Sequence, residues 1–278
     1  MQDVFAYCAE LVRGADRDRY LSALFAPAAQ RGALFALYAF ASELARVREA
    51  AREPLPGEIR LQWWSEVLRG ERGGEASANP VASALRETIA RHRLDVAALL
   101  DLIEAHRFDL YDEPMQTTAD LEDYARRTAG VLFALAAQIL TGIDVKETAA
   151  PAGIAYAIAA LLRAFPLHAA RGQLYVPVEL LARHDVHTSD MSAGPPSAGL
   201  NAALADLREL ARRHLAVTRQ RLLELRQEAL PAFLPLALVG PSLKRLDRCD
   251  AFSPVEIPPW RRQWLVWRAA RNPARIAG

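Results

Sequence analysis

Apolar side chains recur at helical spacing along this whole chain, and the clearest case lies near its centre. Ile154, Ile158, Leu161, Leu162 and Phe165 form one apolar stripe, because residues three and four apart share a helix face. No stretch alternates β-branched with polar residues, which is the pattern of a half-buried strand. The spacing therefore predicts an all-α fold.

Length and composition favour one helical domain over residues 1–278. Of the 278 residues 52% are hydrophobic, so the chain can bury a large core. No repeat with a period of about 20 to 50 residues is visible, which argues against a repeat array. A polar stretch rich in Ser, Gly and Pro, at about 184–199, is expected to be a linker inside this domain.

Local patterns predict where individual helices and loops lie. We expect one long helix over 28–50, one over 118–140 and a C-terminal helix over 260–270. Clusters of Pro, Gly and polar residues predict loops at 54–57, 70–79 and 142–151. Asn79 and Asp95 are expected to cap the helices that follow them, because short polar side chains bond the free N–H groups of a helix start.

The charge pattern bears on the partners of the protein. Its formal net charge is +1, so no strong overall field attracts nucleic acid, and we expect no nucleic-acid partner. Only Lys146 and Lys244 among the 34 basic residues are lysines. The positive charge is therefore almost wholly guanidinium, which suits pairing with carboxylates or phosphates.

Cysteine usage and the N-terminal pattern predict a cytoplasmic protein. Cys8 and Cys249 have neither zinc-binding nor disulfide spacing, which fits a reducing compartment. The first residues lack the patterns of signal and transit peptides. The longest apolar runs, 129–137 and 229–240, are shorter than the roughly 18 to 20 residues that cross a bilayer. We therefore expect no transmembrane helix, and consider peripheral contact with the inner membrane as a further option.

The run that ends the central helix resembles a family of enzymes. Arg163 is followed eight residues on by Arg171-Gly172-Gln173-Leu174-Tyr175-Val176-Pro177, which is similar to the second aspartate-rich motif of the squalene/phytoene synthase family. This resemblance implies a single-domain isoprenoid (terpenoid) synthase-like helical bundle around a central cavity. In the register of this run, Ala164 and His168 occupy the positions of the family's two metal-binding aspartates.

The first aspartate motif of the family is altered in the same way. It follows a run similar to Ala36-Leu37-Tyr38-Ala39-Phe40, and its two aspartates correspond to Ala45 and Glu49. Family members use four carboxylates to hold the Mg²⁺ ions that neutralise the departing diphosphate, since Mg²⁺ prefers oxygen ligands. Here one carboxylate remains, with Arg48 and Arg163 on the same helices. The resemblance thus implies no catalytic residues and no metal, with Mg²⁺ as a cofactor only if the chain is an active transferase.

A third departure concerns the substrate cavity. The family's Tyr-x-x-x-x-Ala-Gly-x-x-Gly motif resembles the segment from Tyr124 to Phe133, with Phe133 in place of the last glycine. In the family the missing side chain leaves room for a prenyl tail, so Phe133 is predicted to fill part of that cavity. A phenylalanine within a helix is also an ordinary core residue.

Taken together, these departures resemble one branch of the family, the assembly factor of respiratory complex I (NADH:ubiquinone oxidoreductase). The shared segments are Tyr7-Cys8, Leu11-Val12-Arg13, 35–40, 43–45, 162–168 and 231–234. The segment 162–168 is the most specific of these, because it contains Pro166 and a proline inside a helix costs about 3 kcal/mol. The resemblance implies a non-catalytic, chaperone-like bacterial relative whose partner is a complex I subunit or assembly intermediate.

Two alternatives remain open on the same residues. The chain is an active Mg²⁺-dependent prenyl transferase, or it binds a prenyl diphosphate or lipid without metal, with arginines in place of the ions. The candidate anion- or ligand-binding residues are Arg48, Arg163, His168, Arg171 and Tyr175. The two arginines of the second motif suit pairing with the protein's own acidic side chains equally well. For His168 we favour a half-buried side chain bonded to the carbonyl that Pro166 frees over a phosphate ligand or proton donor beside Arg171.

Three tryptophans mark the basic C-terminal helix. Trp260, Trp264 and Trp267 recur at i, i+4 and i+7 among arginines. Such a helix is able to lie in a membrane interface. The commoner arrangement buries the indoles and leaves the arginines on the outer face, and this is the arrangement we expect.

Overall fold

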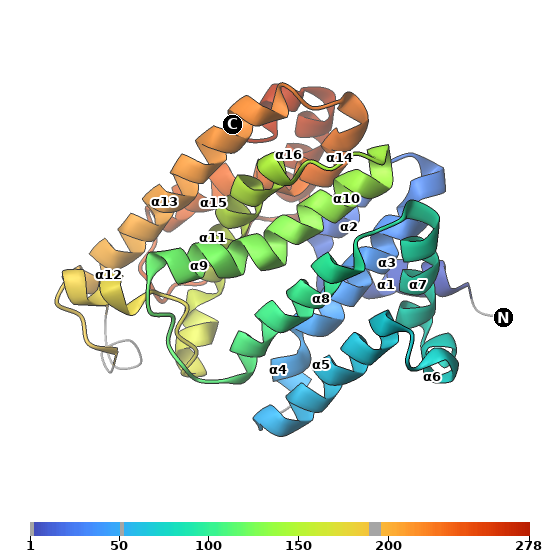
Figure 1. Ribbon diagram of the computed structural model, residues 1–278. Coiled ribbons are helices and arrows are strands. Elements are labelled where there is room, and N and C mark those ends of the chain that lie inside the picture. The colour runs from blue at the N-terminus through green and yellow to red at the C-terminus, as the bar shows by residue number, and fades with distance from the viewer. Residues whose placement is uncertain (1–2, 51–52, 189–195) are drawn as a thin grey trace. The chain divides into compact units, whose positions relative to one another are not determined.

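Every regular element in the described part of the chain is helical. The computed structural model describes residues 3–50, 53–188 and 196–278 (Figure 1). No strand occurs within these residues, so the all-α prediction is confirmed. Part of the predicted linker, 189–195, lies outside the described residues.

The helices are short to medium in length apart from two of 25 residues, α11 and α13. The α-helices are α1 (Val4–Ala15), α2 (Arg17–Ala23), α3 (Ala28–Ala45), α4 (Val47–Ala50), α5 (Pro54–Arg69), α6 (Gly73–Ala78), α7 (Pro80–His92), α8 (Val96–Ala105), α9 (Thr118–Ala125), α10 (Val131–Thr141), α11 (Lys146–Ala170), α12 (Val178–Arg183), α13 (Ala198–Leu222), α14 (Leu230–Phe233), α15 (Val239–Leu246) and α16 (Pro259–Arg271). Short 3-10 helices cover His106–Leu110, Gln227–Ala229, Leu234–Leu238 and Pro273–Arg275, and a π-helix covers Arg126–Gly130.

The chain divides into two compact units, each built from separated segments. The first unit comprises Met1–Tyr111, Val131–Glu147 and Leu225–Pro235. The second unit comprises Asp112–Gly130, Thr148–Glu224 and Leu236–Gly278. Because the segments of the two units alternate along the sequence, no single linker separates them, and the single-domain organisation stays a prediction.

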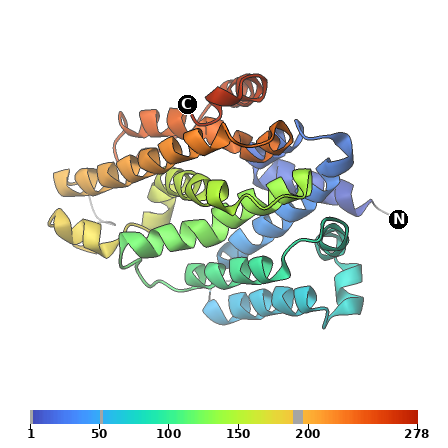
Figure 2. The same cartoon turned by 45° about the horizontal axis from the view of Figure 1, so that its top comes forward.

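The first unit is organised around α3. This helix packs against α1, α7 and α10, and its buried side chains include Leu34, Leu37, Phe40 and Leu44. Phe40 meets Trp64 of α5 edge to face, with ring centroids 4.9 Å apart, which is an arrangement that aromatic pairs favour. Beside it, α5 lies against α8 (Figure 2). A helix that is apolar on several faces is thus the core of this unit.

Three local predictions in the first unit are wrong, and tertiary contacts explain them. The 28–50 helix ends at Ala45 and restarts with α4, which buries Val47 next to Gly57. The predicted 54–57 loop is the first turn of α5, where proline is tolerated because those N–H groups lack helical partners anyway. The predicted 70–79 loop contains α6, which a hydrogen bond from Trp63 Nε1 to Glu75 Oε2 (2.8 Å) ties to α5.

The central apolar stripe lies on α11, which belongs to the second unit from Thr148 onward. The helix starts at Lys146, inside the predicted 142–151 loop, because Asp144 Oδ1 accepts the Lys146 backbone N–H at 2.9 Å. Contrary to expectation, α11 is long and apolar enough to cross a membrane. However, 61% of its most apolar window is buried inside the structure, and the core helix of a globular protein has the same length and composition.

Two glycines allow a close approach within the second unit. A Cβ atom on Gly153 of α11 would lie 2.2 Å from the backbone nitrogen of Gly130, the last residue of the π-helix. Only a residue without a side chain fits there. The π-helix also divides the predicted 118–140 helix into α9 and α10. The segment is therefore helical as predicted, but it is not one continuous α-helix.

The two cysteines give a simple test of the core around α1. Cys8 is buried, and burial raises the pKa of its thiol to about 12, whereas Cys249 is exposed. Because the thiolate is the reactive form, we expect a thiol reagent at about pH 8 to modify Cys249 alone in the native protein and both cysteines after unfolding. Peptide mass spectrometry checks this. Equal labelling of both thiols in native protein would contradict the packing of α1.

Candidate functional site

The first motif positions lie in the first unit, at a break between two helices. Ala45 is the last residue of α3, Glu49 lies in α4, and both are exposed. The two positions therefore do not share one continuous helix, although one helix was predicted over 28–50. Arg46 Nε lies 3.9 Å from Glu49 Oε2. Such an exposed pair contributes little to stability.

Arg48, a candidate anion-binding residue, makes a structural contact. Its side chain is half-buried, and its Nη1 donates a hydrogen bond to the backbone oxygen of Leu110 at 3.2 Å. Leu110 ends the 3-10 helix His106–Leu110, so the guanidinium satisfies a carbonyl at a helix end. One donor of Arg48 is therefore engaged in holding α4 to the segment after α8.

The second motif positions lie on α11 in the second unit. Ala164 and His168 are half-buried and one helical turn apart. The His168 ring packs against Tyr175 with centroids 4.8 Å apart, and Tyr175 packs against Tyr124 of α9 at 5.8 Å. The structure thus brings two candidate residues together and adds Tyr124. The sequence marks Tyr124 only as the first residue of the glycine motif and does not predict its contact with Tyr175.

The backbone after α11 explains the Arg-Gly-x-x-Tyr run. Gly172 has a φ of +72°, in the left-handed region that favours glycine. Its N–H donates to the Ala169 oxygen at 3.1 Å, and the Gln173 N–H donates to the His168 oxygen at 3.0 Å. This pair of bonds is the Schellman ending of a helix. The ending reverses the chain, so that Tyr175 comes back to the ring of His168.

The two arginines of the second motif lie at different depths. Arg163 is half-buried on α11, whereas Arg171 is exposed directly after the last helical residue. The helix continues through Pro166 to Ala170. Anion binding by either arginine stays a prediction, and so does a hydrogen bond from His168 to the carbonyl that Pro166 frees.

A small cavity lies beside His168 within the second unit. Its walls come from α9, α11, α13 and the segment after α11, and include Leu121, Phe165, Gln173 and Tyr175. Its volume is about 10 Å³, which is no more than one water molecule needs. This part of the second unit therefore has no room for a prenyl chain.

Phe133 is a buried residue of α10 in the first unit. Its ring stacks on Phe233 of α14, with centroids 5.4 Å apart and planes 7° apart. Aromatic pairs at this separation add to the free energy of burial. The ring is thus an integral part of the core of the first unit, and its effect on a substrate cavity stays a prediction.

The residues at the motif positions do not fit a magnesium cluster. Ala45 and Ala164 offer no side-chain ligand, and His168 offers nitrogen where Mg²⁺ prefers oxygen. Across the described residues, no group of three or more His, Cys, Asp or Glu side chains is placed to hold a metal ion. These positions therefore supply no ligand set for the metal-dependent ionisation of a diphosphate.

An assembly factor and an enzyme are among the curated relatives of this chain. The human protein named NADH dehydrogenase (ubiquinone) complex I, assembly factor 6 is 30% identical over 246 residues, which cover 88% of this chain and 74% of the relative. The 15-cis-phytoene synthase of Synechococcus elongatus is 27% identical over 209 residues, which cover 70% of this chain and 67% of the relative. The chain is thus similar both to an assembly factor and to an enzyme.

Solved structures share the fold. A dehydrosqualene synthase aligns with a TM-score of 0.82 at 19% identity, covering 97% of this chain and 96% of the other. The squalene synthase HpnC from Alicyclobacillus acidocaldarius aligns with a TM-score of 0.77 at 24% identity, covering 91% and 95%. The sequence model of the squalene/phytoene synthase family matches residues 12–268. The chain therefore belongs to the squalene/phytoene synthase family.

Proposed function

We propose that this chain is a non-catalytic squalene/phytoene synthase homologue that acts as an assembly factor for respiratory complex I. The observation that carries the proposal is its 30% identity, over 88% of its length, to the human assembly factor. The assembly role gives it a protein partner, either a complex I subunit or an assembly intermediate. In this role the helical fold serves as a chaperone-like binding surface.

The side chains at the motif positions support the absence of catalysis. Four aspartates would contribute roughly four negative charges around the metal ions that hold a diphosphate. With Ala45, Ala164 and His168 at three of these positions, Glu49 is the one remaining carboxylate. Because charge neutralisation of the leaving group is the main catalytic term in such a reaction, its loss removes the driving force for ionisation.

Deletion of the gene tests the assembly role. We expect a deletion strain to contain much less assembled NADH dehydrogenase than its parent, measured by native gels and NADH oxidation in membranes. The wild-type chain should restore the complex, and so should Glu49→Gln, because the Glu49 side chain is exposed and its ion pair with Arg46, at 3.9 Å, contributes little to stability. An unchanged complex in the deletion strain would contradict the assembly role. A folded Glu49→Gln variant that fails would contradict the non-catalytic role.

The phytoene synthase relative favours one alternative, an active prenyl transferase. Incubation of the purified chain with farnesyl or geranylgeranyl diphosphate and Mg²⁺, followed by lipid extraction and mass spectrometry, separates the two. We expect no squalene-like or phytoene-like product, and any head-to-head product would overturn the proposal. Binding of a prenyl diphosphate or lipid that persists in a chelator would instead support a metal-independent ligand-binding protein.

A further inference from the structure

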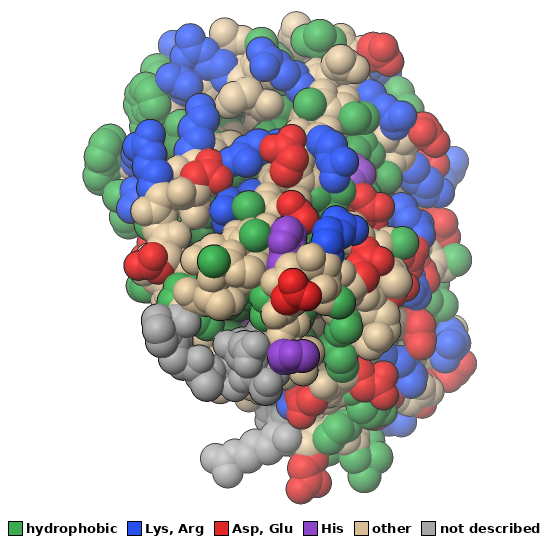
Figure 3. All heavy atoms as spheres, turned by 90° about the vertical axis from the view of Figure 1, so that its left-hand side faces the viewer, with side chains coloured by type: hydrophobic (Ala, Val, Ile, Leu, Met, Phe, Trp, Pro, Cys, Tyr) green, Lys and Arg blue, Asp and Glu red, His purple; other side chains and the backbone are tan. Residues whose placement is uncertain are grey.

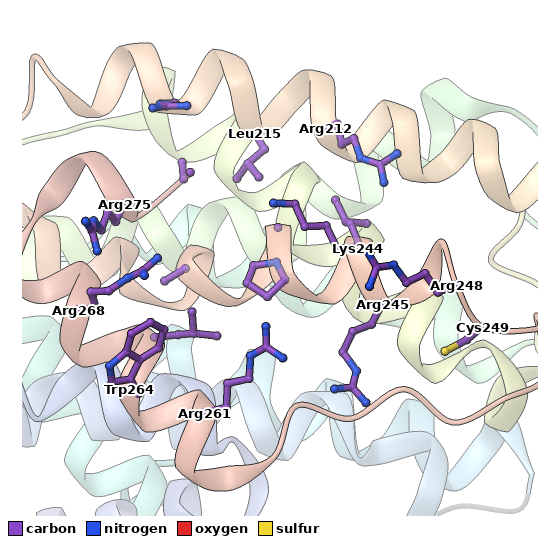
Figure 4. A pocket seen from close by; sticks show the side chains of 18 residues that line it. Arg212, Leu215, Lys244, Arg245, Arg248, Cys249, Arg261, Trp264, Arg268 and Arg275 are labelled. Atoms are coloured by element: carbon purple, nitrogen blue, oxygen red, sulfur yellow. The ribbon is translucent and has the colours of Figure 1, made fainter.

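A basic groove lies in the second unit, between α13, α15, α16 and the residues after α16. Its volume is about 890 Å³. Figure 4 shows Arg261 and Arg268 of α16 and Lys244 of α15 extending into the space between these helices. None of the side chains lining the groove is acidic. The charged side chains of this concave surface are therefore all positive, which concentrates anions.

Seven cations of this groove have no ion-pair partner in the part of the chain that the structure describes. Those on α13 and α15 and directly after α15 are Arg219, Lys244, Arg245 and Arg248. Those on and after α16 are Arg261, Arg268 and Arg275. Across residues 3–50, 53–188 and 196–278, none of the seven has a carboxylate oxygen within 4.0 Å. A bound anion would therefore reduce the electrostatic repulsion among these seven cations.

The neighbouring Arg212 shows the contrast. It also lines the groove, but its guanidinium pairs with Asp247 at 2.5 Å. Figure 3 shows basic side chains at the upper end of the molecule, where α13 and α16 lie in Figure 1. Exposed arginines of other helices, such as Arg13, Arg60 and Arg91, also lie within 4.0 Å of an acidic side chain. The groove differs from these places because seven of its cations are clustered and lack such partners among the described residues.

The outer face of α16 carries three exposed indoles, so the expectation of buried tryptophans is wrong. Trp260, Trp264 and Trp267 are 70%, 46% and 44% exposed. The helix buries Leu265, Val266 and Ala269 instead, and at about 100° per residue these lie on the side opposite the indoles. The buried side is therefore aliphatic, and the aromatic side faces outward.

Two arginines extend this aromatic face. Arg268 lies over the Trp264 ring at 4.4 Å from its centroid, and Arg271 lies over the Trp267 ring at 4.6 Å. Trp264 and Arg268 also line the groove. The indoles and the basic groove are therefore parts of one continuous surface. Tryptophan and basic side chains are the residues that bind at the headgroup level of a membrane.

We propose that the basic groove and the indole face of α16 together bind the surface of a bilayer that contains anionic phospholipids. The groove cations contact lipid phosphates, and the indoles enter the headgroup layer beside them. A free phosphate compound explains the cations but needs no outward indoles, whereas a lipid surface uses both. This surface role stands independently of complex I assembly.

Vesicle binding tests the proposal on the full chain. We expect the protein to sediment with vesicles of phosphatidylcholine containing about one third phosphatidylglycerol, and only weakly with pure phosphatidylcholine. The triple variant Arg245→Gln, Arg248→Gln and Arg261→Gln should bind roughly a hundredfold more weakly, since each basic residue near an anionic surface contributes about fivefold. All three side chains are exposed, so the variant should fold, and circular dichroism verifies this.

A second triple variant controls for net charge. Arg13→Gln, Arg86→Gln and Arg91→Gln remove the same charge from exposed positions of α1 and α7 in the first unit. We expect this variant to bind like wild type. Equal losses in both triple variants would overturn the proposal, because binding would then follow overall charge.

The indoles are tested separately from the charges. Trp260→Ala combined with Trp267→Ala should weaken binding at least tenfold and reduce the blue shift of tryptophan emission on vesicles, whereas Leu55→Ala, at an exposed site of α5, should change neither. If wild type ignored anionic vesicles but bound inorganic diphosphate or an oligonucleotide, the groove would belong to a different ligand. If the double variant bound anionic vesicles like wild type, the proposed role of the indoles would be wrong and the proposal would be overturned.

Discussion

Replacing Gly153 with alanine is expected to lower the free energy of unfolding by at least about 3 kcal/mol. The added Cβ would lie 2.2 Å from the nitrogen and 2.3 Å from the Cα of Gly130, and 2.9 Å from the carbonyl carbon of Ala129. These are backbone atoms, so no side chain can rotate away, and α11 must separate from the π-helix. The midpoint of urea unfolding, followed by circular dichroism, measures the loss.

A second glycine provides the matched control. Gly74 lies in α6, and a Cβ there would meet nothing within 4 Å. Gly74→Ala should therefore stabilise the protein by about 0.5 to 1 kcal/mol, because alanine loses less conformational entropy in a helix. If Gly153→Ala behaved like Gly74→Ala, the contact between α11 and the π-helix would be wrong.

Helix positions were largely predictable from the sequence, because apolar spacing and caps are local. Asn79 Oδ1 accepts two backbone N–H groups at the start of α7, and Asp95 Oδ1 accepts one at the start of α8, as expected. The break after Ala45 and the helix α6 depend instead on contacts with Gly57 and Trp63. Such contacts join residues distant in sequence, and no local pattern reveals them.

The candidate site was predictable only along the motif register. That register located His168 and Tyr175, but the row they form with Tyr124 depends on how α9 packs in the second unit. The orientation of the C-terminal helix was misjudged for a related reason. Burial of the indoles was expected because it is the commoner arrangement, whereas the structure buries Leu265, Val266 and Ala269 of this helix. The side facing the core is decided by fit as well as by area.

Replacing Phe133 with alanine is expected to destabilise the protein by about 3 to 5 kcal/mol. The phenyl ring is 3% exposed and stacks on Phe233, so its removal leaves a cavity and an unpartnered ring. Phe25→Ala, at a side chain that is 41% exposed, should cost under about 1 kcal/mol. In a double-mutant cycle, Phe133→Ala and Phe233→Ala should couple by about 0.5 to 1.5 kcal/mol. Additive effects would contradict the stack.

The glycine that the family carries at this position makes the same site informative about function. Phe133→Gly should destabilise the chain by about 1 kcal/mol more than Phe133→Ala, because glycine is a poor helix former. It should not confer product formation from farnesyl diphosphate and Mg²⁺, since Ala45 and Ala164 still provide no ligand for the metal. A folded Phe133→Gly variant that made a head-to-head product would contradict the proposed non-catalytic role, because the missing carboxylates would then not prevent the reaction.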